Sequence, residues 1–133
     1  MRFRVLSLAL CVSFFLKFDA GYAASDFFSE CEGKQIGDNG SSINLTIMFN
    51  VDQSGRYAGT AEYFNARFEK LFEGKLKDIQ VQPQMVNFDI LYLGGKGKGS
   101  TIKLSLTRHN NGLRGTGVSG YSGKTRTVDV ICK

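Results

Sequence analysis

Few residues of this chain have side chains that could do chemistry, and they are spread widely along the sequence. The single histidine, His109, is followed by two asparagines and a glycine, a setting typical of a solvated turn. A catalytic triad is assembled in space and not in sequence, so a weak hydrolase stays open as an alternative, although no residue pattern points to one. We therefore expect a protein that is not an enzyme and that needs no cofactor.

Two of the three cysteines lie near opposite ends of the segment that we expect to be the mature protein. In an oxidising compartment, Cys31 and Cys132 predict one disulfide that closes the domain. Closing a loop of about 100 residues stabilises a fold by about 4–5 kcal/mol in the chain-entropy model. A metal site is the alternative, but two cysteines and one histidine without clustered spacing fall short of the four ligands of structural zinc.

The N-terminus has the parts of a secretory leader. It begins with basic residues, continues with an apolar run over residues 5–16, and has small residues at Gly21 and Ala23, where signal peptidase requires them. We expect cleavage after Ala23, which makes residues 1–23 the signal peptide and residues 24–133 the domain. The apolar run is about 12 residues, whereas a membrane span needs roughly 20. We therefore expect a secreted or periplasmic protein without a membrane span.

Charge and length limit the classes of function. The whole chain has a net charge of +5, and the leader takes three basic residues and one acidic residue with it, so the remaining excess is small and spread out. A nucleic-acid-binding domain normally has a dense basic stripe, and we therefore expect no nucleic acid partner. About 110 residues are enough for one domain with a modest core.

From residue 43 onward, apolar and polar residues alternate, which indicates half-buried β-strands. Turn signals separate the alternating segments from one another. The strands that this pattern predicts cover residues 43–51, 56–64, 76–81, 85–93, 101–107, 113–118 and 125–132. Residues 25–30 are expected to form a turn or a single helical turn, and residues 65–72 a weak helical turn or an irregular strand.

A glycine-rich segment over residues 94–99 lies between two of these strands. It does not match a phosphate-binding loop, because its last glycine is followed by serine and not lysine, and no helix pattern comes after it. Its glycines leave the backbone flexible. We expect a hairpin loop whose Lys96 and Lys98 can reach into an acidic partner.

Successive short strands without a long helix predict an antiparallel up-and-down sheet. An open sheet of this length would have exposed edges, and closing it into a barrel removes them. The expected fold is all-β: a single antiparallel up-and-down β-barrel of about 7–8 strands, closed by one disulfide.

Five aromatic residues on or near the predicted strands are candidates for the barrel interior: Tyr57, Tyr63, Phe68, Phe88 and Tyr92. A barrel of about eight strands has room either for a packed core or for one small ligand. These residues are therefore predicted either to pack the core or to line a site for a small apolar ligand.

The order of strands and turns resembles that of the small secreted lipocalin-like barrels of bacteria, the calycin and avidin-like proteins. The segments that carry the resemblance include Gly-Arg-Tyr-Ala-Gly-Thr at 55–60, the alternation at 86–90 and Gly-Leu-Arg-Gly-Thr at 112–116. The resemblance implies a lipocalin-like barrel that binds a small apolar ligand or a protein partner. The chain has no tryptophan, so the ligand residues of lipocalins and avidins cannot be carried over to it.

The segment Ser-Gly-Tyr-Ser-Gly-Lys at 119–124 is similar to the inhibitory motif of the periplasmic C-type lysozyme inhibitors, which are also small secreted barrels with a disulfide. This similarity implies an alternative function, the inhibition of a secreted hydrolase such as lysozyme by a loop inserted into an acidic cleft. Lys96, Lys98, Ser119 and Lys124 are then the predicted partner-binding residues. A hollow interior would favour the ligand carrier, and a filled interior with projecting basic loops would favour the inhibitor.

Overall fold

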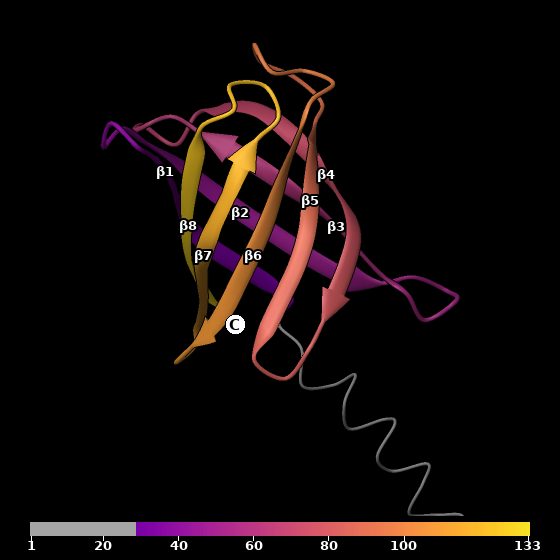
Figure 1. Ribbon diagram of the computed structural model, residues 1–133. Coiled ribbons are helices and arrows are strands. Elements are labelled where there is room, and N and C mark those ends of the chain that lie inside the picture. Colours follow the sequence, from indigo (N-terminus) through magenta and orange to yellow (C-terminus); the bar gives the residue numbers. More distant parts are fainter. Residues whose placement is uncertain (1–28) are drawn as a thin grey trace, which may run out of the picture.

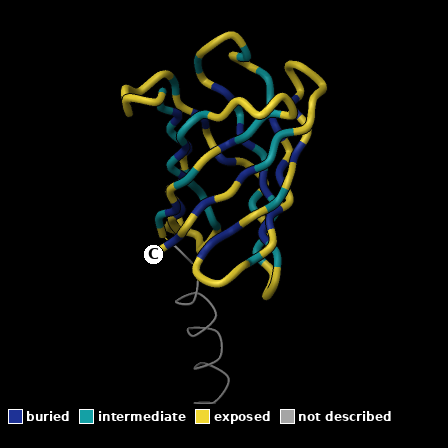
Figure 2. The backbone as a smooth tube through the Cα atoms, turned by 90° about the vertical axis from the view of Figure 1, so that its left-hand side faces the viewer, coloured by how far each residue is buried: buried dark blue, intermediate teal, exposed yellow. Residues whose placement is uncertain are grey.

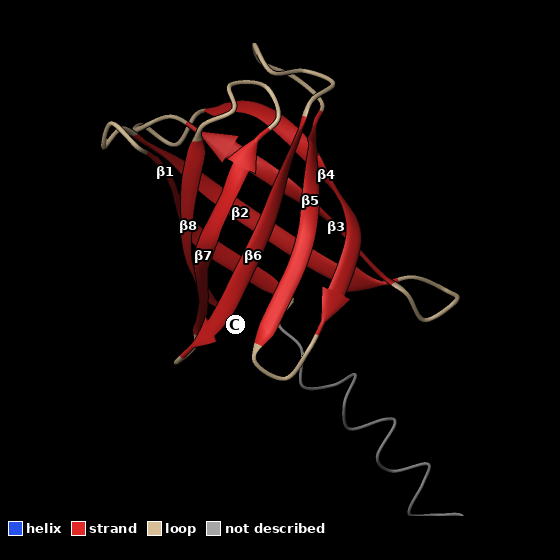
Figure 3. Ribbon diagram, viewed as in Figure 1, coloured by secondary structure: helices blue, strands red, loops and turns tan. Residues whose placement is uncertain are grey.

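The computed structural model describes residues 29–133, which form eight antiparallel strands (Figure 1). The strands are β1 (Glu30–Gly37), β2 (Ser42–Val51), β3 (Tyr57–Phe64), β4 (Lys70–Val81), β5 (Met85–Tyr92), β6 (Thr101–His109), β7 (Gly112–Ser119) and β8 (Thr125–Cys132). Each strand pairs with the next one in sequence, and β1 also pairs with β8, so the sheet closes into a barrel. The predicted all-β, up-and-down barrel is confirmed, and Figure 3 shows only strands and loops among residues 29–133. Among residues 29–133, none belongs to a helix of the length and hydropathy needed to cross a membrane.

The apolar residues of the alternating segments point into the barrel, and the polar residues between them point outward. In β6, Ile102 and Leu104 are buried, whereas Lys103 between them is exposed, and the same alternation continues to the end of the strand. Burying one large aliphatic side chain contributes about 1.5–3 kcal/mol. The inward face of each strand is therefore what holds the closed sheet together.

Two parts of the sheet differ from the predicted strands. The range of β1 was missed because its inward positions beside Cys31 are Gly33 and Gln35, which give no apolar alternation. Of the two forms predicted for residues 65–72, the helical turn is wrong, because residues 65–69 form a loop; residues 70–72 are in a strand, since β4 begins at Lys70. The predicted signal peptide and residues 25–28 of the turn predicted over 25–30 lie outside the described residues, whereas Glu30 already belongs to β1.

Residues 64, 68 and 71 are apolar and have the spacing of one helix face, but their side chains do not share a buried face. Phe68 is 73% exposed and Leu71 is 51% exposed. Phe64 is half-buried at the end of β3, where a register shift interrupts the pairing with β4. An irregularity of the sheet at this place therefore resembled one turn of an amphipathic helix.

Side chains fill the interior of the barrel. The rings of Phe49 and Phe88, from β2 and β5, meet edge to face with centroids 5.6 Å apart. Tyr63 stacks on Phe72 at 4.6 Å and meets Tyr92 edge to face at 5.7 Å. The described residues also form five hollows of 190–490 Å³, and the rings of Phe49, Tyr63, Phe72, Phe88 and Tyr92 line none of these hollows. The rings therefore occupy the space that a ligand would need.

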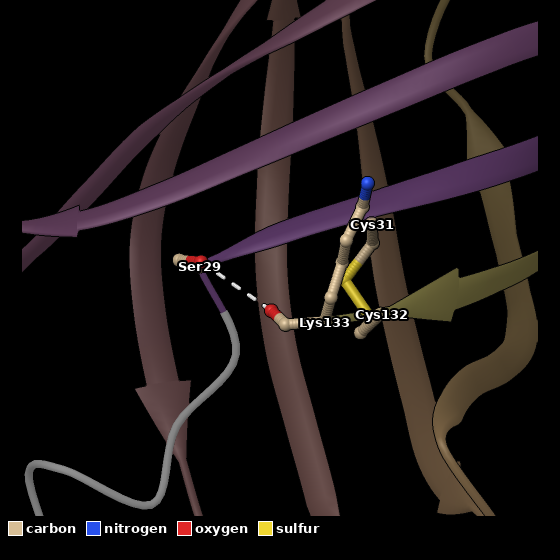
Figure 4. Close-up of a disulfide and its surroundings, with 4 residues drawn as sticks. All are labelled: Ser29, Cys31, Cys132 and Lys133. Carbon is tan, nitrogen blue, oxygen red and sulfur yellow. Dashed lines mark hydrogen bonds between the residues drawn. A yellow bond between two sulfur atoms is a disulfide. The ribbon is translucent and has the colours of Figure 1, made fainter.

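The predicted disulfide between Cys31 and Cys132 is confirmed, and it joins the first strand to the last (Figure 4). The two cysteines are directly opposite each other in the pairing of β1 with β8. Beside them, the backbone N–H of Lys133 donates to the carbonyl oxygen of Glu30 at 2.9 Å, and the hydroxyl of Ser29 donates to the carbonyl oxygen of Lys133 at 3.3 Å. The bond therefore locks the seam at which the barrel closes.

Glycines on the inward face allow neighbouring strands to approach closely. A Cβ atom added at Gly33 would overlap the carbonyl oxygen of Asp129 on β8, and one added at Gly115 would overlap that of Ser105 on β6. Glycines at such places let the strands of a small barrel bend. Both positions therefore require glycine, because a side chain there would collide with the backbone of the neighbouring strand.

The two ends of the barrel differ in the length of their connections, as Figure 2 shows. We call the end with the loops 38–41, 65–69, 93–100 and 120–124 the loop end. The other end has the turns 52–56, 82–84 and 110–111 together with Ser29 and Lys133, and we call it the turn end. The chain enters and leaves the described barrel at the turn end, so the loop end carries no terminus of the described chain.

Candidate functional site

Two neighbouring loops of the loop end form one surface. The backbone N–H of Gly120 donates to the carbonyl oxygen of Thr101 at 2.7 Å, which ties the β7–β8 loop to the base of the β5–β6 loop. A Cβ atom on Gly97 would lie 3.4 Å from the Cβ of Tyr121, so the two loops are also in contact further out. We call residues 93–100 and 120–124 the basic loop pair.

Hydrogen bonds within the β5–β6 loop hold it in a turned shape. The backbone N–H of Tyr92 donates to Ser100 and that of Gly99 donates back to Tyr92, both at 2.9 Å. Gly95 and Gly99 have φ angles of 75° and 88°, which residues other than glycine rarely adopt. The glycines that predicted a flexible loop thus also permit a compact one.

The β7–β8 loop is anchored by Ser119, a predicted partner-binding residue. This serine is only 4% exposed, and its hydroxyl oxygen accepts hydrogen bonds from the backbone N–H groups of Tyr121 and Ser122 at 3.3 and 3.4 Å. Its own N–H donates to the carbonyl oxygen of Lys124 at 2.9 Å. Ser119 therefore shapes the loop from below, while Tyr121, 59% exposed, projects from it.

The lysines of the basic loop pair have no partner among residues 29–133. Lys96, Lys98 and Lys124 are exposed and their ammonium groups make neither an ion pair nor a hydrogen bond there. By contrast, Lys70 pairs with Glu62 at 3.0 Å and with Glu73. The loop pair thus presents positive charge that no carboxylate of the described chain neutralises.

The structure brings together only some of the aromatic residues predicted to bind a ligand. Tyr63, Phe88 and Tyr92 are buried in the core. Tyr57 is half-buried at the turn end, and Phe68 is on the exposed β3–β4 loop. The five therefore do not form one ligand-lined cavity, and the three interior ones pack against other side chains.

A polar cluster closes the interior below the loop end, and the sequence analysis did not predict it. The Tyr63 hydroxyl donates to Oε1 of Gln35 at 3.1 Å, and Nε2 of Gln35 donates to the Tyr92 hydroxyl at 3.4 Å. Gln35 is 8% exposed, and a buried amide requires partners. Its inward position on β1, two residues from Gly33, is the only sequence signal that could have pointed to it.

Burial of the Tyr63 hydroxyl, reinforced by the neighbouring Tyr92, raises the pKa of Tyr63 well above its ordinary value. The phenol therefore stays neutral and keeps donating to Gln35 at physiological pH. Because all three side chains of the cluster face one another, the arrangement serves packing and orientation and presents no free reactive group to solvent.

The single histidine lies away from the basic loop pair. His109 ends β6 at the turn end and is exposed. Within residues 29–133, no three side chains of the His, Cys, Asp or Glu types gather where they could hold a metal ion.

Comparisons with known proteins support the fold and leave the function open. No family model matches this chain, and no curated protein sequence matches it significantly. Among solved structures, the chain is similar to a redesigned β-barrel, with a TM-score of 0.66 and 16% sequence identity over 84% of this chain and 95% of that chain. At this level of identity the likeness shows a common fold alone, a closed antiparallel eight-stranded β-barrel.

Proposed function

We propose that this chain is a secreted, non-enzymatic binding protein that recognises an acidic protein partner through the basic loop pair. The observation that carries the proposal is the combination of three unpaired, exposed lysines and the exposed ring of Tyr121 on two loops in contact with each other. Tyrosine is enriched in protein interfaces, and clustered positive charge steers an acidic partner. A disulfide is compatible with secretion.

The filled interior favours a protein partner over a small apolar ligand. A pocket for a drug-sized molecule has a volume of about 300–1,000 Å³, and the rings of Phe49, Phe88 and the Tyr63 group take up the inside of the barrel. The lipocalin-like resemblance therefore extends, in this proposal, to recognition by loops at one end and not to carriage of a ligand in the lumen.

Inhibition of a secreted hydrolase is the narrower form of the same proposal. The β7–β8 loop is held by backbone hydrogen bonds at 2.7 and 2.9 Å and by the Ser119 hydroxyl, so little ordering remains to be done on binding. Such a preorganised loop, with Tyr121 and Lys124 projecting, suits insertion into an acidic cleft. Lysozyme activity measured with and without an excess of the protein tests this form directly.

Capture from the secreted or periplasmic fraction of the source tests the broader proposal. The protein is immobilised through its C-terminus, because Lys133 is at the turn end and leaves the loop end free. A variant with Ser in place of Lys96, Lys98 and Lys124 is compared with a control in which exposed Lys75, Lys77 and Lys133 are replaced. Both variants lose the same charge.

We expect an acidic protein to be retained by the parent and the control and lost from the loop variant, and to be released by moderate salt. Equal retention by the two variants would show that the loop pair is not the binding surface. Retention of a partner by neither the parent nor the control would argue against the proposal as a whole.

A further inference from the structure

A groove on the outside of the barrel lies beside the β3–β4 loop, apart from the basic loop pair. It has a volume of about 490 Å³ and is open to solvent along the outer faces of β1 and β2. Polar side chains line it on β1 and β2, and aromatic rings line it at the end of β3 and in the loop that follows. The polar residues are Glu32, Lys34, Asn44 and Thr46, the aromatic residues are Phe64 and Phe68, and the backbone of Gly33 and Leu45 completes the lining.

Strand register places the two kinds of side chain on opposite sides. Lys34 on β1 is opposite Asn44 on β2, and Asn44 is opposite Phe64 on β3, so these three form one row across the outer face. Glu32 and Thr46 occupy the next row. The charged groups therefore line the β1 side of the groove and the aromatic groups line the β3 side.

The β3–β4 loop is built around Asn65. Its side-chain oxygen accepts hydrogen bonds from the backbone N–H groups of Arg67 and Glu69 at 2.9 and 3.0 Å, and its amide nitrogen donates to the Glu69 carboxylate at 2.9 Å. The amide of Asn44 donates to the Asn65 carbonyl oxygen at 3.0 Å. This last bond ties the loop to the floor of the groove.

The hydrogen bonds around Asn65 shape the loop that carries Phe68. The residue has a φ of 62°, in the left-handed region that bulky side chains rarely adopt, and its ring is 73% exposed. A large ring held in an unfavourable backbone conformation and left uncovered gains nothing for the core. Strained residues of this kind concentrate at functional sites.

Polar groups across the groove are available to a ligand. Within residues 29–133, the side chains of Glu32, Lys34 and Thr46 make no hydrogen bond or ion pair. Glu32 and Lys34 have opposite charges, so together they favour neither an anion nor a cation. The complementary ligand has one apolar face, many hydroxyl groups and no net charge.

We propose that this groove binds a short neutral oligosaccharide. The C–H groups on one face of a pyranose ring pack against the negatively polarised faces of aromatic rings, here Phe64 and Phe68. The hydroxyl groups at the ring edge then accept from Lys34 and donate to Glu32, with Thr46 able to do either. The site is separate from the proposed protein-binding surface, and either can exist without the other.

Titration of the isotope-labelled secreted protein, followed by NMR of its backbone amides, tests the proposal. The probes are maltotriose, cellotriose and N,N′,N″-triacetylchitotriose. We expect at least one of them to bind with a Kd of roughly 0.1–10 mM and to shift amides of residues 32–34, 44–46 and 64–69. The chain with serines in place of its loop-pair lysines should bind equally well.

Phe68→Asn is the decisive variant, because asparagine tolerates the left-handed backbone and lacks the ring. Its affinity for the saccharide should fall at least about tenfold, corresponding to about 1.4 kcal/mol. Tyr121→Asn removes an exposed ring from the basic loop pair and should leave the affinity unchanged. The proposal is overturned if no trisaccharide shifts these amides, if Phe68→Asn binds as the parent does, or if only a capped aromatic tripeptide occupies the groove.

Discussion

At the turn end, connections of five, three and two residues join the strands, whereas the loop end uses connections of four, five, eight and five. The two ends also differ in whether their charged side chains have partners. In the turn 52–56, the Asp52 carboxylate accepts hydrogen bonds from the Ser54 hydroxyl and from the N–H groups of Ser54 and Arg56. These hydrogen bonds lower the pKa of Asp52. The lysines of the basic loop pair have no such partners among residues 29–133.

The interior changes along the same axis. Near the turn end it holds the disulfide, and the loop-end side is closed by hydrogen-bonded Gln35, Tyr63 and Tyr92. The disulfide and the buried side chains that stabilise the barrel are therefore separate from the exposed loops on which we propose that a partner is recognised. Substitutions in these two regions should separate stability from recognition.

The largest loss of stability is expected at the seam. Replacing Cys31 and Cys132 by serine removes the cross-link and should lower the free energy of unfolding by about 4–5 kcal/mol in the chain-entropy model. Urea denaturation of the parent and the double variant measures the difference. A loss below 1 kcal/mol would show that β1 and β8 are held together without the bond.

Phe88→Ala should be nearly as damaging. The ring is 1% exposed and meets Phe49 across the interior, and truncation of a buried phenylalanine typically costs about 3–5 kcal/mol. Thermal and chemical denaturation of the variant measure the loss. A much smaller cost would indicate an interior with room to spare and would contradict the filled interior described above.

At the polar side of the interior, Gln35→Leu should cost about 1–3 kcal/mol, because it leaves buried hydroxyl groups without partners. Tyr63→Phe should cost less in the Gln35→Leu background than in the parent, since the hydrogen bond between the two side chains is already lost. A double-mutant cycle by chemical denaturation measures this coupling. Additive effects would contradict the cluster as described.

The raised pKa of Tyr63 predicts a loss of stability in alkali. Above pH 10 the unfolded chain releases the phenol proton while the folded chain keeps it, so the free energy of unfolding falls by up to about 1.4 kcal/mol per pH unit from this group. Denaturation between pH 9 and about 11.5 should show a weaker pH dependence for Tyr63→Phe.

Substitution of the lysines at 96, 98 and 124 by serine should have the smallest effect on stability, about 0.5 kcal/mol or less, because these side chains are exposed and unpaired in the described structure. The same variant is expected to lose its protein partner. A large loss of stability would mean that the loops support the barrel, and that the two ends are not separate in role.

The fold could be predicted largely from the sequence because alternation specifies an inward and an outward face. Residues 86–92 and 102–106 show it clearly, and both segments are strands. The range of β1 could not be predicted in the same way, since Gly33 and Gln35 occupy inward positions for reasons that appear only when β8 and the two tyrosines are in place.

The candidate site was predictable in part. In an up-and-down barrel every second connection is at the same end, so Lys96 and Lys124 had to share an end once the strands were assigned. The contact between their loops, the burial of Ser119 and the outward position of Phe68 depend on tertiary packing and on the register shift near Phe64.

Recognition by the loops, as we propose it, depends on an interior that is filled by side chains and holds no ligand. Native mass spectrometry of the protein purified from its source measures whether the interior holds a ligand. We predict the mass of the polypeptide with one disulfide and no molecule bound in the interior. A small apolar molecule that copurifies, is released only on unfolding and is lost in a variant with a bulkier interior would contradict the account.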